Sequence, residues 1–210
     1  MAEEQRQRIV LATHNAGKVR ELAGPLVDFG VEVIGLEAFP QIGDIEETGT
    51  TFEENALIKA RAVARITGLV SVADDSGLMV EALDGRPGVY SARYSDDWQN
   101  LPGESRDQRN IRKLLRELAG VPEDRRACCF VSCMAAVKPS GAEMVVRGTW
   151  EGRLLTAPRG ENGFGYDPIF FDLLIGKTAA QLSREDKIAR SHRGNALRAL
   201  LARWKMFMAE

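Results

Sequence analysis

The sequence lacks a marked excess of charge of either sign. Its 210 residues carry 28 Lys and Arg against 30 Asp and Glu, a formal net charge of −2 at pH 7. A protein that grips a nucleic-acid backbone normally presents a basic stripe, so we expect no nucleic-acid partner, and any affinity for phosphate must be local. The hydrophobic content of 44% is ordinary for a globular protein that buries a core.

Long apolar runs are also missing. No segment approaches the roughly 20 apolar residues that cross a bilayer. The N-terminal stretch MAEEQRQRIV lacks the basic-then-apolar order of a signal peptide. We therefore expect no membrane contact and a cytoplasmic location.

Cysteine is scarce, and its placement does not suggest a disulfide framework. The three cysteines, Cys128, Cys129 and Cys133, lie together in ACCFVSCMAAV without C-x-x-C spacing. An odd number argues against paired disulfides. Because a free cysteine behaves as a small hydrophobic residue, we expect buried thiols on a strand and no redox or metal role.

The first part of the chain alternates between strand and helix patterns, which is typical of an α/β protein. The elements expected there are strand 8–13, helix 18–30, strand 31–36 and helix 52–68. Thr50 and Glu53 fit a capping box that would start the last of these helices near Thr51, and Gly68 would end it. Residues 69–83, LVSVADDSGLMVEAL, are interpreted as a strand, a polar break and more strand.

The second part of the chain changes character. The elements expected there are helix 108–118, hairpin strands 128–137 and 143–150, strand 168–171, and one or two helices within 183–204. A hairpin added to strand–helix alternation predicts a mixed sheet. We find no internal repeat or flexible linker, so a single domain is expected.

The join between the first strand and helix is a candidate phosphate site. A Walker A motif is excluded, because Ala12 stands in place of its first glycine and Val19 in place of its hydroxyl residue. Exposed amides at a helix N-terminus, beside Asn15 and Lys18, would still form a cradle for an anion. An ordinary turn is the structural alternative.

Two acidic stretches could supply carboxylates to a cation. Glu46 and Glu47 precede the helix that carries Lys59, and a solvated acidic loop is the alternative explanation. Asp74 and Asp75 follow an apolar strand; neighbouring side chains on a strand face opposite ways, so one would enter a cleft and the other would orient loop amides. A surface turn is the alternative. Glu47 and Asp75 together would suit Mg²⁺.

A glycine-rich stretch, GENGFGYDPIFF, is a candidate for binding a flat ligand. Gly160, Gly163 and Gly165 would let a backbone approach closely, and Phe164 offers a stacking face. A glycine-rich hairpin is the alternative. Near the C-terminus, His192 and Arg193 form a donor-rich cluster that could also be a solvated helix start.

Five motifs, taken together and in order, resemble the inosine triphosphate pyrophosphatase family, whose members hydrolyse non-standard purine nucleoside triphosphates. They are LATHNAGKVREL, EETGTTFEENALIKA, ADDSGLMVEALDGRPGVYSARY, GFGYDPIFF and SHRGNAL. The match runs from about Ile9 to about Leu201. The resemblance implies one pyrophosphatase domain over residues 1–210, with an elongated mixed α/β sheet flanked by helices. It further implies two lobes with a central active-site cleft, and usually a homodimer.

The resemblance also implies roles for individual residues. Asp75 and Lys59 would be catalytic, Asp75 as proton acceptor and Lys59 in contact with phosphate, while Glu47 and Asp75 would bind Mg²⁺. The residues implied to bind substrate are Thr13, His14, Asn15, Ala16, Gly17 and Lys18 at the triphosphate, Ser76 in contact with the substrate, Phe164, Gly165, Tyr166, Asp167 and Lys187 around the base and sugar, and His192 and Arg193 at the purine. His14 departs from the glycine expected in many relatives.

The implied reaction is attack of water at the α-phosphorus of ITP, dITP or XTP, which gives the monophosphate and pyrophosphate and cleanses the nucleotide pool. Two alternatives stay open. One is a nucleotide-binding regulatory module without catalysis, and the other is a house-cleaning pyrophosphatase for other modified nucleotides. A metal-dependent nuclease is disfavoured by the overall charge.

Overall fold

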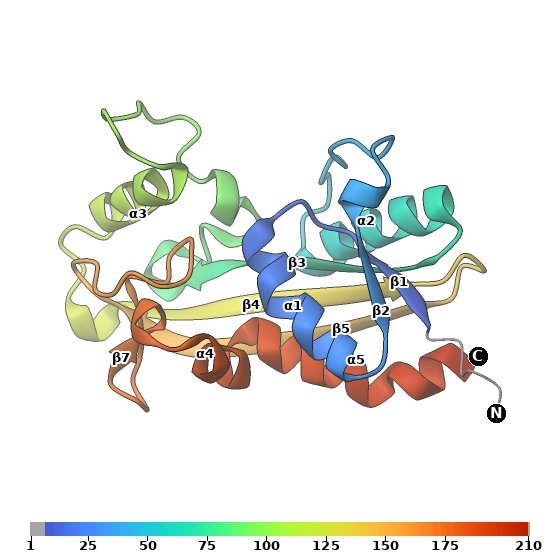
Figure 1. Ribbon diagram of the computed structural model, residues 1–210. Helices are drawn as coiled ribbons and strands as arrows, with labels where there is room; N and C mark the ends of the chain where they lie inside the picture. Colours follow the sequence, from blue (N-terminus) through green and yellow to red (C-terminus); the bar gives the residue numbers. More distant parts are fainter. Residues whose placement is uncertain (1–6, 210) are drawn as a thin grey trace. The chain divides into compact units, whose positions relative to one another are not determined.

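The computed structural model describes residues 7–209, within which seven strands form one mixed sheet (Figure 1). The strands are β1 (Arg8–Leu11), β2 (Glu32–Gly35), β3 (Val70–Val80), β4 (Ala127–Val137), β5 (Glu143–Leu154), β6 (Phe170–Asp172) and β7 (Lys177–Thr178). Their order is β2-β1-β3-β4-β5-β6-β7. Strand β1 is parallel to β2 and β3, whereas β6 is antiparallel to β5 and β7. The predicted mixed α/β sheet is confirmed.

Five α-helices accompany the strands in the described part of the chain. They are α1 (Ala16–Asp28), α2 (Phe52–Thr67), α3 (Arg106–Glu117), α4 (Arg184–Arg190) and α5 (His192–Ala209). Each predicted helix is present, and the C-terminal helical pattern resolves into two helices. None of these helices combines the length and apolar character that a membrane crossing requires.

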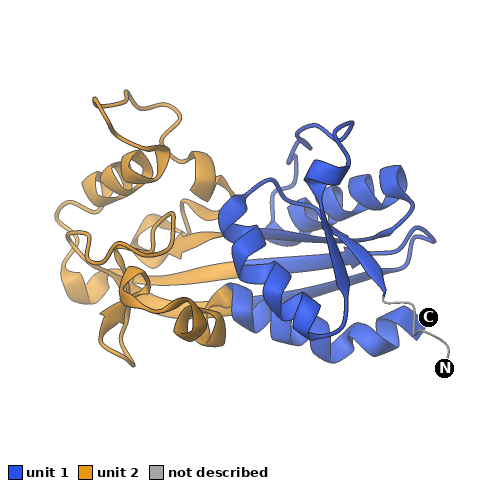
Figure 2. Cartoon of the chain, viewed as in Figure 1, with its two compact units in different colours: residues 1–75, 132–148, 193–210 blue, residues 76–131, 149–192 orange. Residues whose placement is uncertain are grey.

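The chain divides into two compact units (Figure 2). Unit 1 comprises Met1–Asp75, Ser132–Gly148 and Arg193–Glu210, and unit 2 comprises Ser76–Val131 and Thr149–His192. The residue bounds of β3, β4 and β5 each include parts of both units. The cleft implied between two lobes stays a prediction.

Unit 1 buries both faces of its part of the sheet, because successive side chains of a strand point to opposite faces. Ile9 and Leu11 of β1 pack in one apolar cluster with residues of α1 and α5. Val10 and Ala12 pack in a second cluster with the alanine-rich face of α2. Helices α1 and α5 therefore cover one face and α2 the other, which fixes where their polar residues can reach.

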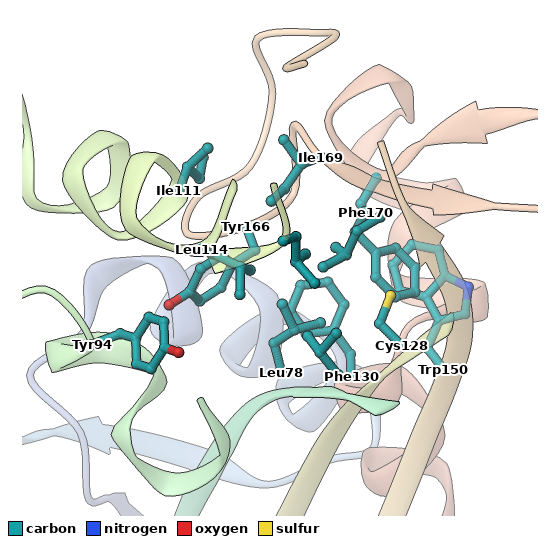
Figure 3. Packing of buried hydrophobic residues seen from close by; sticks show 14 of the residues in the cluster. Leu78, Tyr94, Ile111, Leu114, Cys128, Phe130, Trp150, Tyr166, Ile169 and Phe170 are labelled. Atoms are coloured by element: carbon teal, nitrogen blue, oxygen red, sulfur yellow. The ribbon is translucent and has the colours of Figure 1, made fainter. Parts of the chain in front are cut away.

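Unit 2 has its own aromatic core (Figure 3). The ring centroid of Phe170 lies 4.5 Å from that of Phe130 and 4.7 Å from that of Trp150. The indole nitrogen of Trp150 donates to Asp172 Oδ2 at 2.9 Å, so its polar atom is satisfied inside the core. Helix α3 and its C-cap add Ile111, Leu114, Leu115 and Leu118 to this core.

Two local predictions need correction. The capping box of α2 uses Thr51 and Glu54, one residue later than expected, because the hydroxyl of Thr51 accepts from the Glu54 amide at 3.1 Å. The repeated Thr-Thr and Glu-Glu pairs let both registers fit the sequence pattern. Gly68 ends the helix with φ +66°, as predicted. The expected polar break in 69–83 is absent, because β3 runs without interruption from Val70 to Val80.

The cysteines behave as predicted. Cys128 and Cys133 are buried on β4, Cys129 is half-buried beside them, and all three are free thiols. Burial raises the pKa of both the Cys128 and the Cys133 thiols. These thiols therefore stay protonated and serve as packing groups.

Candidate functional site

The loop between β1 and α1 presents exposed backbone at the positive end of a helix. Asn15 is the N-cap, and its Oδ1 accepts from the Lys18 amide at 3.1 Å. The Asn15 amide in turn donates to Thr13 Oγ1 at 3.1 Å. His14, Asn15 and Ala16 are exposed, whereas Gly17 is buried. The turn is thus held by its own side chains and leaves the helix dipole facing solvent, where an anion is favoured.

Asp74 gathers positive charge inside unit 1. Its Oδ2 lies 2.8 Å from Lys18 Nζ and 3.4 Å from Arg193 Nε, and its Oδ1 accepts a hydrogen bond from Ser132. Arg193 is also ion-paired with Glu21. The alternative of a surface turn is wrong, because Asp74 is buried within β3. A fully buried carboxylate at this point of β3 needs cations, and it finds them on α1 and α5.

The ammonium group of Lys59 contacts both Glu47 and Asp75, the two acids predicted to bind a cation together. Its Nζ lies 2.7 Å from Glu47 Oε1 and 3.2 Å from Asp75 Oδ1, and it also donates to the carbonyl of Asp74 at 3.0 Å. Asn55, one turn earlier on α2, donates to Asp75 Oδ2 at 3.2 Å. Residues separated in sequence thus converge on one ammonium group, whereas Glu46 is exposed.

The pKa values of the two neighbouring aspartates, Asp74 and Asp75, are shifted in opposite directions. Burial opposes ionisation of Asp74, but Lys18 and Arg193 outweigh it and hold the pKa of that carboxyl far below its usual range. Burial raises the pKa of Asp75, and the nearby carboxylates of Glu47 and Asp74 add to the increase against the opposing effect of Lys59. Burial lowers the pKa of Lys18, while at Lys59 the attraction of Asp75 and Glu47 exceeds the effect of burial and raises the pKa.

The carboxylates of Glu47 and Asp75 are the candidates to hold a divalent cation. Within residues 7–209, no three His, Cys, Asp or Glu side chains cluster as a complete metal cage. Glu47 and Asp75, however, share a single ammonium group, so two carboxylates already face a common positive charge. Mg²⁺ commonly takes one or two carboxylates and completes its octahedron with water and substrate phosphate. The two acids therefore fit Mg²⁺ that arrives with a phosphorylated ligand.

In unit 2, the glycine-rich loop is fixed by two carboxylates. Asp167 Oδ2 accepts from the Phe164 amide at 2.9 Å and pairs with Lys187 Nζ at 2.6 Å. The same ammonium lies 4.9 Å from the centroid of the Phe164 ring. Asp107, at the start of α3, accepts from the Gly165 amide at 2.7 Å. The half-buried Phe164 ring is therefore held by a rigid loop.

Glycine is required in this loop for a reason that the sequence alone did not show. Gly163 has φ +81°, and a Cβ there would collide with the Asp167 carboxylate. Part of the glycine pattern therefore serves the loop itself, and not the close approach of a ligand.

Three predicted substrate contacts have other partners in the structure. Tyr166 is buried in the core of unit 2, and its hydroxyl donates to the Ser91 carbonyl at 2.9 Å, so its ring has a packing role (Figure 3). His192 is stacked on Phe130, with ring centroids 4.7 Å apart. Arg193 holds Asp74 and Glu21 in unit 1. The alternative of a solvated helix start is wrong, since the side chains of His192 and Arg193 are both buried. Their reading of a purine stays a prediction.

The sequence of this chain is similar to those of known proteins over nearly its whole length. The sequence model of the Ham1 family matches residues 9–203. The chain belongs to the Ham1 family. A dITP/XTP pyrophosphatase of Nitratidesulfovibrio vulgaris (strain Hildenborough) is 63% identical over 199 residues, which cover 95% of this chain and 96% of that protein. A dITP/XTP pyrophosphatase of Escherichia coli (strain K12) is 48% identical over 199 residues, 93% of this chain and 96% of that protein.

Solved structures give the same result for the fold. A HAM1 protein from Coxiella burnetii superposes with a TM-score of 0.84 at 40% identity, covering 95% of this chain and 99% of that one. A nucleoside-triphosphatase / dITP/XTP pyrophosphatase from Mycobacterium abscessus superposes with a TM-score of 0.73 at 46% identity, covering 93% of this chain and 99% of that one. The sheet described above is therefore the sheet of Ham1 proteins.

Sequence reasoning missed several residues that support the site of this Ham1 protein. Asn55 could have been identified from the sequence, because it is a polar residue on the buried face of α2, between Phe52 and Ala56. No sequence pattern identifies Ser132 or Asp107. Ser132 lies 58 residues from its partner Asp74, and Asp107 lies 58 residues from its partner Gly165. Glu21 is equally hidden, because it lies one turn after Lys18 and meets Arg193 only in the fold.

Proposed function

We propose that this Ham1-family protein hydrolyses non-standard purine nucleoside triphosphates (ITP, dITP and XTP) to the monophosphate and pyrophosphate, and so cleanses the nucleotide pool. The observation that carries the proposal is the convergence of Glu47, Lys59 and Asp75 in unit 1, which also holds the loop at the start of α1. The names of the relatives at 63% and 48% identity support the same reaction.

The protein's own groups bind and position the triphosphate. The loop from Thr13 to Lys18 offers helix N-terminal amides and one ammonium group, and Lys59 offers a second. Transfer of a phosphoryl group asks mainly for such positioning and for neutralisation of charge. Asp75 takes the proton of the water that attacks the α-phosphorus, and its raised pKa suits a base that must accept a proton.

We propose Mg²⁺ as the cofactor, held by the carboxylates of Glu47 and Asp75 together with substrate oxygens. When bound, it supplies positive charge that stabilises the developing charge on the phosphates. In the protein without metal, the positive charge of Lys59 offsets the negative charges of the same two carboxylates. This reduces the repulsion between Glu47 and Asp75 before substrate binds.

The base is recognised by the residues of unit 2 that surround Phe164, with Lys187, Ser76 and His192. Hypoxanthine and xanthine present a carbonyl acceptor at position 6, whereas adenine presents an amino donor. A site whose donors face that position rejects ATP by roughly 10⁴-fold, because a mismatched analogue leaves the buried donors unpaired. Arg193 contributes through Asp74 and Glu21, or by direct contact with the purine after leaving them.

A homodimer in the cytoplasm, without nucleic-acid or membrane partners, completes the proposal, as the family resemblance implies. Analytical ultracentrifugation of the purified protein tests the oligomeric state, and a mass of one chain would contradict the dimer.

One assay tests the reaction. A panel of ITP, dITP, XTP, GTP, ATP and modified pyrimidine triphosphates is incubated with and without Mg²⁺, and monophosphate and pyrophosphate are both measured. We expect pyrophosphate from the non-standard purines only, and only with Mg²⁺. Tight binding without pyrophosphate would favour the regulatory module instead, and a preference for modified pyrimidines would favour the other class of house-cleaning pyrophosphatase.

A further inference from the structure

The carboxylate of Asp74 has no part in the proposed reaction, yet it contacts three polar side chains of unit 1. Its side chain is completely buried, and it contacts Lys18, Arg193 and Ser132. The backbone carbonyl of the same residue accepts from Lys18 Nζ at 3.0 Å and from Lys59 Nζ at 3.0 Å. Both ammonium groups proposed to meet the triphosphate are therefore held by one residue of β3.

Counting donors shows what this arrangement does to Lys18. An ammonium group has three N–H donors. Asp74 takes one of them with its carbonyl oxygen, and its Oδ2 forms an ion pair with the same group at 2.8 Å. These two contacts with one residue restrict the orientation of the four-carbon side chain, and they leave two donors for an anion bound at the start of α1. Without Asp74, burial would favour the neutral amine, whereas the adjacent carboxylate favours the charged form.

We infer that Asp74 is a positioning residue, whose carboxylate and carbonyl hold the Lys18 ammonium group in place and aimed at the phosphates of the substrate. The identity of that anion as a nucleoside triphosphate rests on the proposed function. Asp74 itself touches no substrate in this mechanism and acts through Lys18. A simpler role, in which Asp74 only balances the buried charge of Arg193, would leave Lys18 and phosphate binding unaffected.

The two roles are separated by a double-mutant cycle on phosphate binding. Calorimetry at one fixed Mg²⁺ concentration measures the affinity for inorganic tripolyphosphate, which has no base to recognise. The proteins compared are wild type, Asp74→Asn, Lys18→Met and the double variant. We expect each single substitution to weaken binding by about 10-fold to 100-fold, the range for a hydrogen bond to a charged group. In the Lys18→Met background, Asp74→Asn should weaken it by less than about twofold.

Controls separate positioning from loss of stability. Leu200→Ala removes a fully buried side chain of α5 in unit 1, so it lowers the melting temperature but should leave tripolyphosphate affinity within about twofold of wild type. If Asp74→Asn does not fold, Asp74→Glu replaces it in the cycle, because it keeps the charge and displaces the carboxylate by one methylene. Its loss of affinity should likewise depend on Lys18.

Three results would each overturn the inference. They are an equal loss of affinity on substitution of Asp74 in both backgrounds, wild-type affinity in the Asp74 variants, and no tripolyphosphate binding by the wild type. The proposed function and the role of Asp74 can fail separately. If the double-mutant cycle gives the expected affinities but the protein does not hydrolyse non-standard purine nucleotides, the proposed function is contradicted and the role of Asp74 is supported.

Discussion

Replacing Asp75 by asparagine tests the proposed chemistry with little change of structure. Asp75 uses Oδ1 to accept from Lys59 and Oδ2 to accept from Asn55, at 3.2 Å each. An amide has only one acceptor oxygen, so one of these hydrogen bonds is lost, at a cost of about 1 kcal/mol. Against this cost, the buried negative charge and its repulsion by Glu47 disappear. We therefore expect the free energy of unfolding to stay within about 1 kcal/mol of wild type.

The effect on catalysis should be far larger. An amide cannot accept the proton of the attacking water, and loss of a general base typically lowers turnover by 10²-fold to 10⁴-fold. We expect Asp75→Asn to lower kcat for ITP by at least about 10²-fold. If Asp75 also holds Mg²⁺, the Mg²⁺ concentration that gives half-maximal activity should rise in the same variant.

The assay is pyrophosphate release at saturating ITP over a Mg²⁺ titration, with urea unfolding of the same samples. Asp28→Asn, an exposed aspartate at the end of α1, is the matched control and should keep wild-type kcat. Unchanged turnover in a folded Asp75→Asn protein would refute the assignment of Asp75 as base. A fall in kcat that parallels a large loss of stability would refute the reasoning about its environment.

Further outcomes follow from the same contacts. Lys59→Met should lower the free energy of unfolding of the metal-free protein by about 3–5 kcal/mol, because it strands two partly buried carboxylates, and MgCl₂ should restore part of it in urea titrations. Native Cys128 and Cys133 should not react with a thiol reagent at pH 8 and should react after unfolding, because burial raises the pKa of both thiols. Arg61→Ala should change stability by at most about 1 kcal/mol, since its pair with Glu143 is largely exposed.

The elements of the fold could be predicted from the sequence because local patterns determine them. The period of the apolar residues located every α-helix, and the hairpin around residues 138–142 followed from two apolar runs and a turn. The observed starts of two helices differ from the predicted ones, because the N-cap is a different residue from the one expected. Asn15 caps α1 and starts it at Ala16, two residues before the predicted start, and Thr51 caps α2 in place of Thr50.

The site was predictable only as a set of candidates, because its contacts join distant segments. Taken alone, Glu47 could equally belong to a solvated acidic loop, and the chemistry of Mg²⁺ paired it with Asp75 only on the condition that the fold joins them. The family resemblance implied the same pair. The structure brings both to Lys59. The same reasoning left Arg193 open between a donor-rich cluster and a solvated helix start, because its partner Asp74 lies 119 residues earlier in the chain. No periodicity in the sequence encodes that contact.

The polar break expected at Asp74 and Asp75 fails for a reason that bears on function. Two acids in an apolar strand are unfavourable if both are buried alone, so the pattern suggested a turn. Since neighbours on a strand face opposite ways, each acid meets a different environment. Asp74 lies between Lys18 and Arg193 and stays permanently ionised, whereas Asp75 lies beside Glu47 and has a raised pKa. Environments that separate the pKa values of two adjacent carboxyls support the different roles proposed for them, Asp74 as an anchor for cations and Asp75 as an acceptor of protons.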